Sequence, residues 1–265
     1  MYRQFFGFTD EVFSKAINVE NIHKTESFKE LTRRFDYMKK NRGIMLLTGD
    51  AGAGKTMALR FFISNLSSKS FFPVYLPLST VAVGDFYKQL NTALHGENIF
   101  GKSKMYNSIQ KQIINLSVNR NLVPVIIFDE AHLLKDQNYH ELQIITNFQY
   151  DTQSPALFII AGQSVLQDRL RGYNLESFNQ RLSLKYHIPP LTLEETKKYI
   201  LHHFTLCKGS AQILKDAAFE AVYNISRGVP RIIGNIVVKA LMLAASKKEQ
   251  TIDEESILSS SQEVL

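Results

Sequence analysis

The chain has 265 residues, 45% of them hydrophobic, so it is long and apolar enough to bury a sizeable core in one large domain or in a domain with an appendage. Its formal net charge of +6 is compatible with a polyanionic partner such as nucleic acid, without identifying one. The single cysteine, Cys207, excludes an internal disulfide and favours a reducing compartment.

The sequence predicts neither a signal peptide nor a membrane span. Residues 1–13 lack the cationic stretch followed by an apolar one that a signal peptide carries. The apolar runs at 123–128 and 156–162 are far shorter than the roughly 18 residues that a spanning helix needs. We therefore expect a soluble, cytoplasmic protein with no membrane partner.

In chain order, the pattern first predicts an entry segment and then an α/β domain. Residues 1–42 are rich in aromatic side chains and end in a helix over about 26–40. From residue 43 onward, short apolar strands alternate with helices, which predicts βαβ units and a parallel sheet with helices on both faces (an α/β/α arrangement) over 43–188. The expected strands are 44–48, 71–78, 123–130 and 156–162, and the expected helices are 55–66, 83–94, 105–119 and 138–150.

Beyond residue 188 the sequence predicts helices alone, hence a small helical domain over 189–265. The pair Pro189-Pro190 suits a hinge, and Thr192 to Glu195 resembles a capping box. The expected helices are 191–204, 214–225, 230–248 and 251–260.

A phosphate-binding loop connects the first predicted strand to its helix. Gly49, Gly54, Lys55 and Thr56 satisfy the pattern G-x-x-x-x-G-K-[ST] in the required strand-to-helix context. Its glycines let backbone N–H groups and the helix N-terminus face phosphate. Lys55 should reach the β- and γ-phosphates, and Thr56 should bind Mg²⁺. The full set of nucleotide-binding candidates in the loop is Gly49, Asp50, Ala51, Gly52, Ala53, Gly54, Lys55, Thr56 and Met57.

Two carboxylates follow the buried strand at 123–128. Asp129 and Glu130 should lie at the carboxyl edge of the sheet, where ligands bind in open α/β folds. Alone, such a pair is often a solvated strand end. Together with the phosphate loop it predicts ATP hydrolysis, with Asp129 in the magnesium shell and Glu130 orienting or deprotonating the attacking water.

Charge that develops on the γ-phosphoryl group calls for a cation, often an arginine supplied by another subunit. Arg181 lies just before the expected end of the α/β domain. Arg231 lies in the first turn of a predicted helix that opens with Pro230. The alternative for each of them is that it is an ordinary surface arginine with no role in phosphoryl transfer.

Several of these segments together resemble an AAA+ ATPase, a P-loop NTPase with a helical lid. Beside the phosphate loop they are IIFDEAH at 126–132, AGQ at 161–163, NQR at 179–181 and GVPRI at 228–232. MYRQFFGF at 1–8 and LKYHI at 184–188 resemble the ExeA-type group more narrowly. The resemblance implies that Arg181 acts on a neighbouring subunit's ATP and that Arg231 is the lid sensor. Gln163 occupies the place of the first sensor, where many AAA+ proteins have Asn, Ser or Thr.

Two branches share this resemblance. ExeA itself is a secretion-associated membrane ATPase with a spanning segment and a cell-wall-binding region after the lid. TnsC and TniB, and more distantly MuB and IstB, are helpers encoded beside transposases. Because the chain ends at Leu265, soon after its lid, and because residues 75–90 resemble the transposition relatives, we expect a bacterial transposition helper. An ExeA-type ATPase core and a nucleotide switch that scarcely hydrolyses ATP remain as alternatives.

The transposition resemblance implies that ATP-bound subunits assemble into rings or helical filaments on double-stranded DNA and recruit a transposase, with or without a target-selection protein. Such DNA contacts are made to phosphates and are largely independent of sequence. We expect a basic loop at 100–104 to provide them, with an incidental solvated loop as the alternative. The DNA-binding candidates are Lys88, Lys102, Ser103 and Lys104.

The aromatic residues of the entry segment have two interpretations. Phe5, Phe6, Phe8 and Phe13 could pack under the adenine and between subunits, or they could be apolar contacts to the sheet. His132 follows the carboxylate pair, and we assign it no chemistry.

Overall fold

A computed structural model describes residues 2–14, 17–77, 82–148 and 154–261. The chain divides into two units. The helical unit consists of Met1–Ser27, Asp50–Gly54 and Pro189–Leu265. The sheet unit consists of Phe28–Gly49 and Lys55–Ile188. Each unit has its own core, as described below.

The sheet unit is built on a five-stranded parallel sheet with the strand order β2-β3-β4-β1-β5. This sheet and the helices on it confirm the predicted α/β fold of a P-loop NTPase, followed by a helical part. The strands are β1 (Gly43–Gly49), β2 (Phe71–Pro77), β3 (Val123–Asp129), β4 (Leu157–Gly162) and β5 (Leu182–Ile188).

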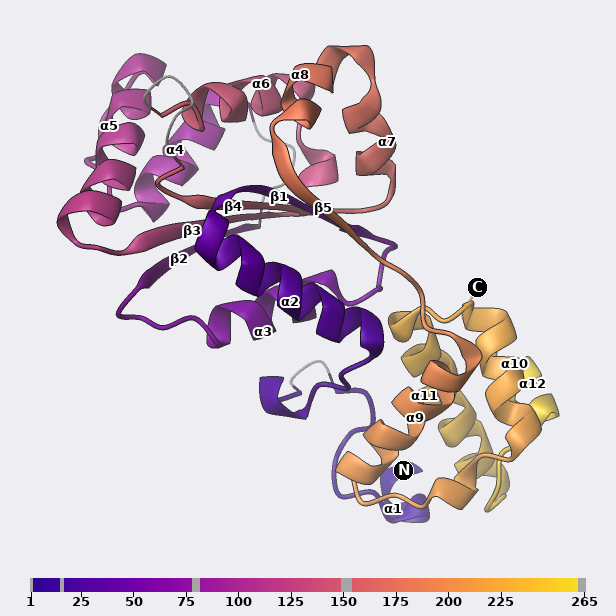
Figure 1. Cartoon of the computed structure of the whole chain (residues 1–265). Helices are drawn as coiled ribbons and strands as arrows, with labels where there is room; N and C mark the ends of the chain where they lie inside the picture. The colour runs from indigo at the N-terminus through magenta and orange to yellow at the C-terminus, as the bar shows by residue number, and fades with distance from the viewer. Residues whose placement is uncertain (1, 15–16, 78–81, 149–153, 262–265) are drawn as a thin grey trace. The chain divides into compact units, whose positions relative to one another are not determined.

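Helices cover both faces of this sheet (Figure 1). One face packs on α2 and α3, and the other on α4 to α8. Successive strand residues point to opposite faces, so Met45 and Leu47 pack towards α2 and α3 while Leu46 packs towards the other layer. The helices of this unit are α2 (Glu26–Asn41), α3 (Lys55–Ser64), α4 (Val83–Ala93), α5 (Lys102–Ile114), α6 (Asp136–Ile145), α7 (Val165–Arg171) and α8 (Glu176–Gln180).

Three expectations for the sheet unit were wrong in detail. Strand β5 was not expected, although its burial alternates residue by residue as in an edge strand with one solvated face. Helix α6 ends at Ile145 instead of continuing to Phe148; Thr146 forms a turn and Asn147 has no regular structure. Helix α5 begins at Lys102, so most of the expected basic loop is helical. Leu78, Gln149 and Tyr150, at the ends of predicted elements, lie outside the described residues.

Short helical turns complete the secondary structure. They are η1 (Val19–Asn21), the π-helical η2 (Asn115–Asn119), η3 (Ala131–Leu133), η4 (Tyr173–Leu175) and η5 (Ala211–Ile213).

The helical unit consists of α1 (Tyr2–Phe6), α9 (Leu193–Leu206), α10 (Asp216–Ser226), α11 (Pro230–Lys247) and α12 (Glu254–Ser261). The predicted capping box is confirmed: Glu195 N–H donates to the Thr192 hydroxyl at 3.2 Å, and Thr192 N–H donates to the Glu195 carboxylate at 3.1 Å. Pro230 opens α11, as expected from its fixed φ and missing N–H. Residues 262–265 at the end of the predicted helical domain lie outside the described residues.

The aromatic residues of the entry segment pack on these helices and not on the sheet. The Phe8 ring lies 5.3 Å from the Phe204 ring of α9, and the Phe13 ring lies 4.5 Å from that of His203. A Cβ on Gly234 of α11 would lie 3.2 Å from Phe13, so the two are closely packed. The interpretation of these rings as contacts to the sheet was therefore wrong.

Acid should destabilise the helical unit through His203. Burial, and the nearby rings of His202 and His23, lower the pKa of His203 from 6.5 to about 4. Below pH 6.5 the unfolded chain binds a proton that the folded chain does not. The free energy of unfolding therefore decreases as the pH is lowered from about 6.5 to about 4. The shift corresponds to about 3 kcal/mol in total.

Urea unfolding between pH 7 and pH 4 measures this effect. In His203→Gln the free energy of unfolding should depend less on pH over this range, whereas His140→Gln, at an exposed position on α6, should keep the slope of the unsubstituted chain. Equal slopes for all three proteins would show that His203 is not the group responsible.

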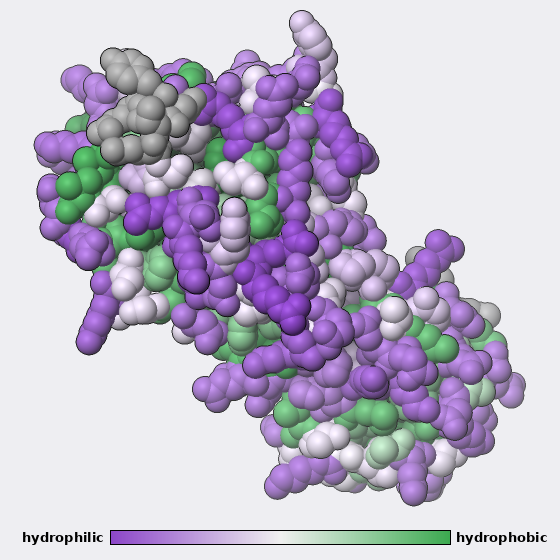
Figure 2. Space-filling view, viewed as in Figure 1, coloured by the Kyte–Doolittle hydropathy of each residue, from purple (hydrophilic) through white to green (hydrophobic). Residues whose placement is uncertain are grey.

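Hydrophilic side chains cover most of the visible face of both units, with apolar side chains in separate patches between them (Figure 2). Among the described residues, no helix has both the length and the apolar character needed to cross a bilayer.

Candidate nucleotide site

Lys55 lies where β1 ends and α3 begins. It is the first residue of α3, and its side chain is buried, with 6% of the residue exposed. Its Nζ donates a hydrogen bond of 2.7 Å to the carbonyl oxygen of Gly49. A buried ammonium group is costly unless it has a partner of opposite charge, and the first turn of a helix also favours an anion because of the helix dipole. Lys55 therefore suits a phosphate ligand.

Residues Asp50–Gly54, in the middle of the phosphate-binding loop, belong to the helical unit. Gly52 and Gly54 have φ of +86° and +98°, values that glycine adopts without strain. Within this unit, Arg231 N–H donates to the Gly52 carbonyl at 3.4 Å, and a Cβ on Gly52 would lie 2.6 Å from the Arg231 Cβ. The start of α11 therefore packs directly on Asp50–Gly54. Met57, the last loop candidate, is half-buried in α3.

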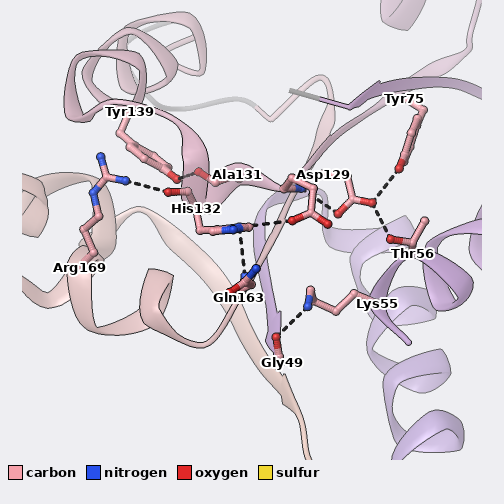
Figure 3. Close-up of polar contacts among 11 residues, drawn as sticks. Gly49, Lys55, Thr56, Tyr75, Asp129, Ala131, His132, Tyr139, Gln163 and Arg169 are labelled. Carbon is pink, nitrogen blue, oxygen red and sulfur yellow. Dashed lines mark hydrogen bonds and ion pairs between the residues drawn. The ribbon is translucent and has the colours of Figure 1, made fainter. Parts of the chain in front are cut away.

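Asp129 ends β3 and is 2% exposed. Its Oδ2 accepts hydrogen bonds from the Thr56 hydroxyl at 2.9 Å and from the Tyr75 hydroxyl at 2.7 Å, and its Oδ1 accepts from Glu130 N–H at 2.9 Å (Figure 3). Carboxylate and hydroxyl oxygens are ligands that Mg²⁺ prefers. The two candidate metal ligands, Thr56 and Asp129, are thus brought together, and their chemistry fits this ion.

Glu130 follows with a left-handed backbone, φ +53° and ψ +30°. This conformation is unusual for a residue with a side chain, and such residues are frequent at functional sites. Its side chain is 49% exposed, so water can reach it. Gln163 directly follows β4, the neighbour of β3, and its backbone N–H donates to His132 Nδ1 at 3.4 Å. Glu130 and Gln163 therefore both lie at the carboxyl edge of the sheet.

Arg181 lies elsewhere. It connects α8 to β5, directly before the first residue of that strand. Since β5 runs parallel to β1, its amino end lies at the edge of the sheet opposite to the Lys55 end of β1. The structure thus does not bring Arg181 together with this chain's own Lys55 and Asp129.

Three residues that sequence reasoning did not select lie among these groups. Tyr75 on β2 donates to Asp129, and burial and this hydrogen bond raise the pKa of its phenol, which keeps it a donor. His132 contacts both Glu130 and Gln163. Arg169 of α7 donates to the His132 carbonyl at 3.1 Å. The position of Tyr75 next to Asp129 depends on the register between β2 and β3, which no sequence motif encodes.

The DNA-binding candidates lie on two adjacent helices. Lys88 is exposed on α4, and Ser103 and Lys104 are exposed in the first turn of α5. Lys102 is engaged within the protein, because its Nζ pairs with the Glu141 carboxylate at 2.5 Å. Tyr87 donates to the other oxygen of the same carboxylate at 2.8 Å. Lys102 therefore links α5 to α6 although 54% of its side chain is exposed, and Lys88 and Lys104 are the other exposed cations of the set.

The family described as an AAA domain matches residues 38–170, half of the chain. The chain belongs to the AAA domain family. It is also 26% identical to General secretion pathway protein A of Aeromonas hydrophila over an alignment of 260 residues that covers 95% of this chain and 46% of that protein. The chain thus spans less than half the length of this relative.

Solved structures show that the AAA+ fold extends over almost the whole chain. Cdc6p of Pyrobaculum aerophilum superposes with a TM-score of 0.68 at 17% identity, over 97% of this chain and 72% of that one. Aeropyrum pernix ORC1, solved in complex with DNA, gives 0.68 at 14% identity over 94% and 68%. The Thermotoga maritima branch migration motor RuvB gives 0.53 at 20% identity over 98% and 73%. At these identities the likeness concerns the fold alone.

Tyr75→Phe should raise the Mg²⁺ concentration needed for half-maximal nucleotide hydrolysis by about 3- to 10-fold. The substitution removes one of the two hydroxyl groups that fix the Asp129 carboxylate, so more of the carboxylate's orientations are unsuited to a metal. Mg²⁺ titration of hydrolysis measures the effect, with Tyr37→Phe on the exposed part of α2 as the control. An unchanged Mg²⁺ midpoint would show that Thr56 alone suffices to orient Asp129.

Proposed function

We propose that this protein hydrolyses ATP with Mg²⁺ and regulates DNA transposition by assembling on double-stranded DNA in its ATP-bound form. The observation that supports hydrolysis most directly is the cluster in which Thr56 donates to the buried Asp129, next to the half-exposed Glu130. A P-loop fold with this set of side chains is what phosphoryl transfer to water requires.

In this proposal the loop residues Gly49–Met57 hold the phosphates, with Lys55 as their cation. Thr56 and Asp129 hold Mg²⁺, which shields phosphate charge when bound. Glu130 takes a proton from water, and Gln163 and Arg231 contact the nucleotide as sensors. Arg181 serves the nucleotide of the next subunit, and its place at the opposite edge of the sheet from Lys55 supports such an action on another chain.

Supplying Arg181 from a neighbour makes assembly depend on the nucleotide. A subunit interface that contains the γ-phosphate is stabilised by the triphosphate and is lost after hydrolysis. We propose that the subunits form rings or helical filaments that recruit a transposase, with or without a target-selection protein, in the bacterial cytoplasm.

The proposed DNA surface is the exposed pair Lys88 and Lys104, together with Ser103. A net charge of +6 supports binding to a polyanion, and relatives in fold such as ORC1 have been solved in complex with DNA. Such contacts would be made to phosphates and would be independent of sequence.

The identity to General secretion pathway protein A favours a second candidate, the ATPase core of a secretion-type protein. Both candidates share the nucleotide chemistry, and they differ in whether duplex DNA is a ligand.

Fluorescence anisotropy with a labelled duplex separates the two. With a non-hydrolysable ATP analogue, binding should be tight at low salt and should weaken steeply as salt rises. In the double substitution Lys88→Ala with Lys104→Ala, the slope of log affinity against log salt should become shallower by about 2, close to one for each lost phosphate contact. Lys69→Ala, at an exposed position after α3, is the control.

A protein that hydrolyses ATP but binds no duplex at low salt with any nucleotide would exclude the transposition proposal and favour the secretion-type candidate. A protein that binds the analogue but does not hydrolyse ATP would support the nucleotide switch instead.

A further inference from the structure

His132 lies between two parts of the candidate nucleotide site. It belongs to the short turn η3 after β3, and its side chain is only 11% exposed. Its Nδ1 lies 3.5 Å from Oε2 of Glu130 and 3.4 Å from the backbone nitrogen of Gln163 (Figure 3). One ring atom thus faces both the proposed catalytic carboxylate and the end of β4.

These two contacts require different protonation of the same nitrogen. To accept the Gln163 N–H, Nδ1 must carry a lone pair, so the proton of a neutral ring is on Nε2. To donate to the Glu130 carboxylate, Nδ1 must carry the proton. A hydrogen bond accepted from Gln163 and one donated to Glu130 are therefore mutually exclusive at Nδ1, and the tautomer of His132 decides which of them can form.

The backbone around His132 is held in place. Tyr139 of α6 donates a short hydrogen bond to the Ala131 carbonyl, and Arg169 of α7 donates to the His132 carbonyl. The Arg169 guanidinium is itself fixed by two hydrogen bonds to Asp136, of 2.9 and 2.5 Å. These contacts fix the backbone of the turn. A change between the two partners of Nδ1 therefore involves movement of the His132 ring and of the Glu130 side chain only.

A tight contact also fixes the distance between this turn and β4. A Cβ on Gly162, the last residue of β4, would lie 3.1 Å from the His132 backbone nitrogen. Since Gln163 follows directly, a shift of the end of β4 changes the distance from the Gln163 N–H to the ring. Any such shift therefore changes which contact of Nδ1 is favoured.

We propose that His132 is a positioning residue that orients Glu130, and that the end of β4 at Gln163 competes with Glu130 for its Nδ1. The orienting form carries the proton on Nδ1. This inference rests on the proposed ATP hydrolysis, because orienting Glu130 matters only if Glu130 acts on water. Glu130 is half exposed with several side-chain torsions, so the loss of its ring partner leaves many unproductive orientations.

The test compares His132→Leu with His132→Asn. Leu has a similar size and no donor, and the side-chain amide of Asn places an N–H near the position of Nδ1. His132→Leu should lower kcat for ATP hydrolysis about 10-fold, with KM and the Kd of a fluorescent ATP analogue unchanged. His132→Asn should restore most of the rate. His140→Leu, at an exposed position on α6, is the control for loss of a histidine.

A second readout does not depend on activity. The ¹⁵N chemical shifts of the His132 ring distinguish its two tautomers. In Glu130→Ala, Nδ1 has lost its acceptor, so the population should move towards the form with the proton on Nε2.

Equal kcat for His132→Leu and the unsubstituted chain, or ring shifts that do not respond to Glu130→Ala, would overturn the inference. If kcat were reduced equally in His132→Leu and His132→Asn, the inference would also be overturned. Such a result would mean that the N–H donor near Nδ1 does not matter and that His132 has a merely structural role. If the unsubstituted chain itself does not hydrolyse ATP, the proposed function fails, while the ring shifts still report whether His132 and Glu130 are linked.

Discussion

Glu130→Gln should lower ATP hydrolysis about 10²- to 10³-fold and leave ATP binding intact. The amide has the size of the carboxylate but takes no proton from water. The left-handed backbone of Glu130 and its hydrogen bond from N–H to Asp129 are backbone features, so the substitution leaves them in place. Lys55, Thr56 and Asp129 keep their contacts, which is why the nucleotide should still bind. Phosphate release at saturating ATP, together with the Kd of a fluorescent ATP analogue, measures the two effects.

Glu220→Gln, at an exposed position on α10, is a matched control that should hydrolyse ATP at the full rate. A Glu130→Gln protein that hydrolyses ATP within a factor of about three of the unsubstituted chain would contradict the assigned role, because loss of a general base costs far more. The variant has a second use: if ATP holds the subunits together, it should accumulate the assembled form.

Lys55→Ala should weaken ATP binding about 10- to 100-fold and abolish detectable hydrolysis. The substitution removes a buried cation at the start of α3, the point of the chain best suited to hold phosphate charge. ADP binding should weaken less than ATP binding, because Lys55 is expected to contact the γ-phosphate as well as the β-phosphate. Isothermal titration of both nucleotides measures the difference.

Lys69→Ala serves as the control, since Lys69 is an exposed lysine a short distance further along the chain. Thermal unfolding without nucleotide shows whether Lys55→Ala is folded. The folded variant should gain little thermal stability from added ATP, in contrast to the unsubstituted chain. An equal gain in both proteins would mean that the nucleotide binds elsewhere.

The sequence was sufficient for most of the fold because the strands β1, β3 and β4 are short, buried apolar runs between helices. Strand β5 was not predicted, although apolar and polar residues alternate over Leu182–Ile188, a pattern that indicates an edge strand with one solvated face. The sequence predicts a basic loop at 100–104, but in the structure Gly101 is the residue directly before α5, with φ +96°, and the helix begins at Lys102.

The candidate site, like the fold, could be predicted only in part from the sequence. Lys55, Thr56 and Asp129 follow from motifs, and the structure brings them to one edge of the sheet. Tyr75 and Arg169 belong to no motif, and they reach the site only through the pairing of β2 with β3 and the packing of α7 on the turn after β3.

For the DNA surface, the sequence identified lysines but not their partners. Glu141 lies far from Lys102 in the chain, so the ion pair that engages Lys102 depends on how α6 packs against α5. Pairing between distant helices is decided by tertiary structure, which residue spacing does not reveal.

The central claim is that ATP controls an assembly on DNA. Negative-stain microscopy of the full chain with duplex DNA tests it most directly, with ATP, a non-hydrolysable analogue, ADP and no nucleotide, and with Glu130→Gln in ATP. We predict rings or filaments on DNA with the analogue and with Glu130→Gln in ATP, and none with ADP or without nucleotide. Particles that remain monomeric in every condition, or that bind DNA equally with ADP and with the analogue, would contradict the claim.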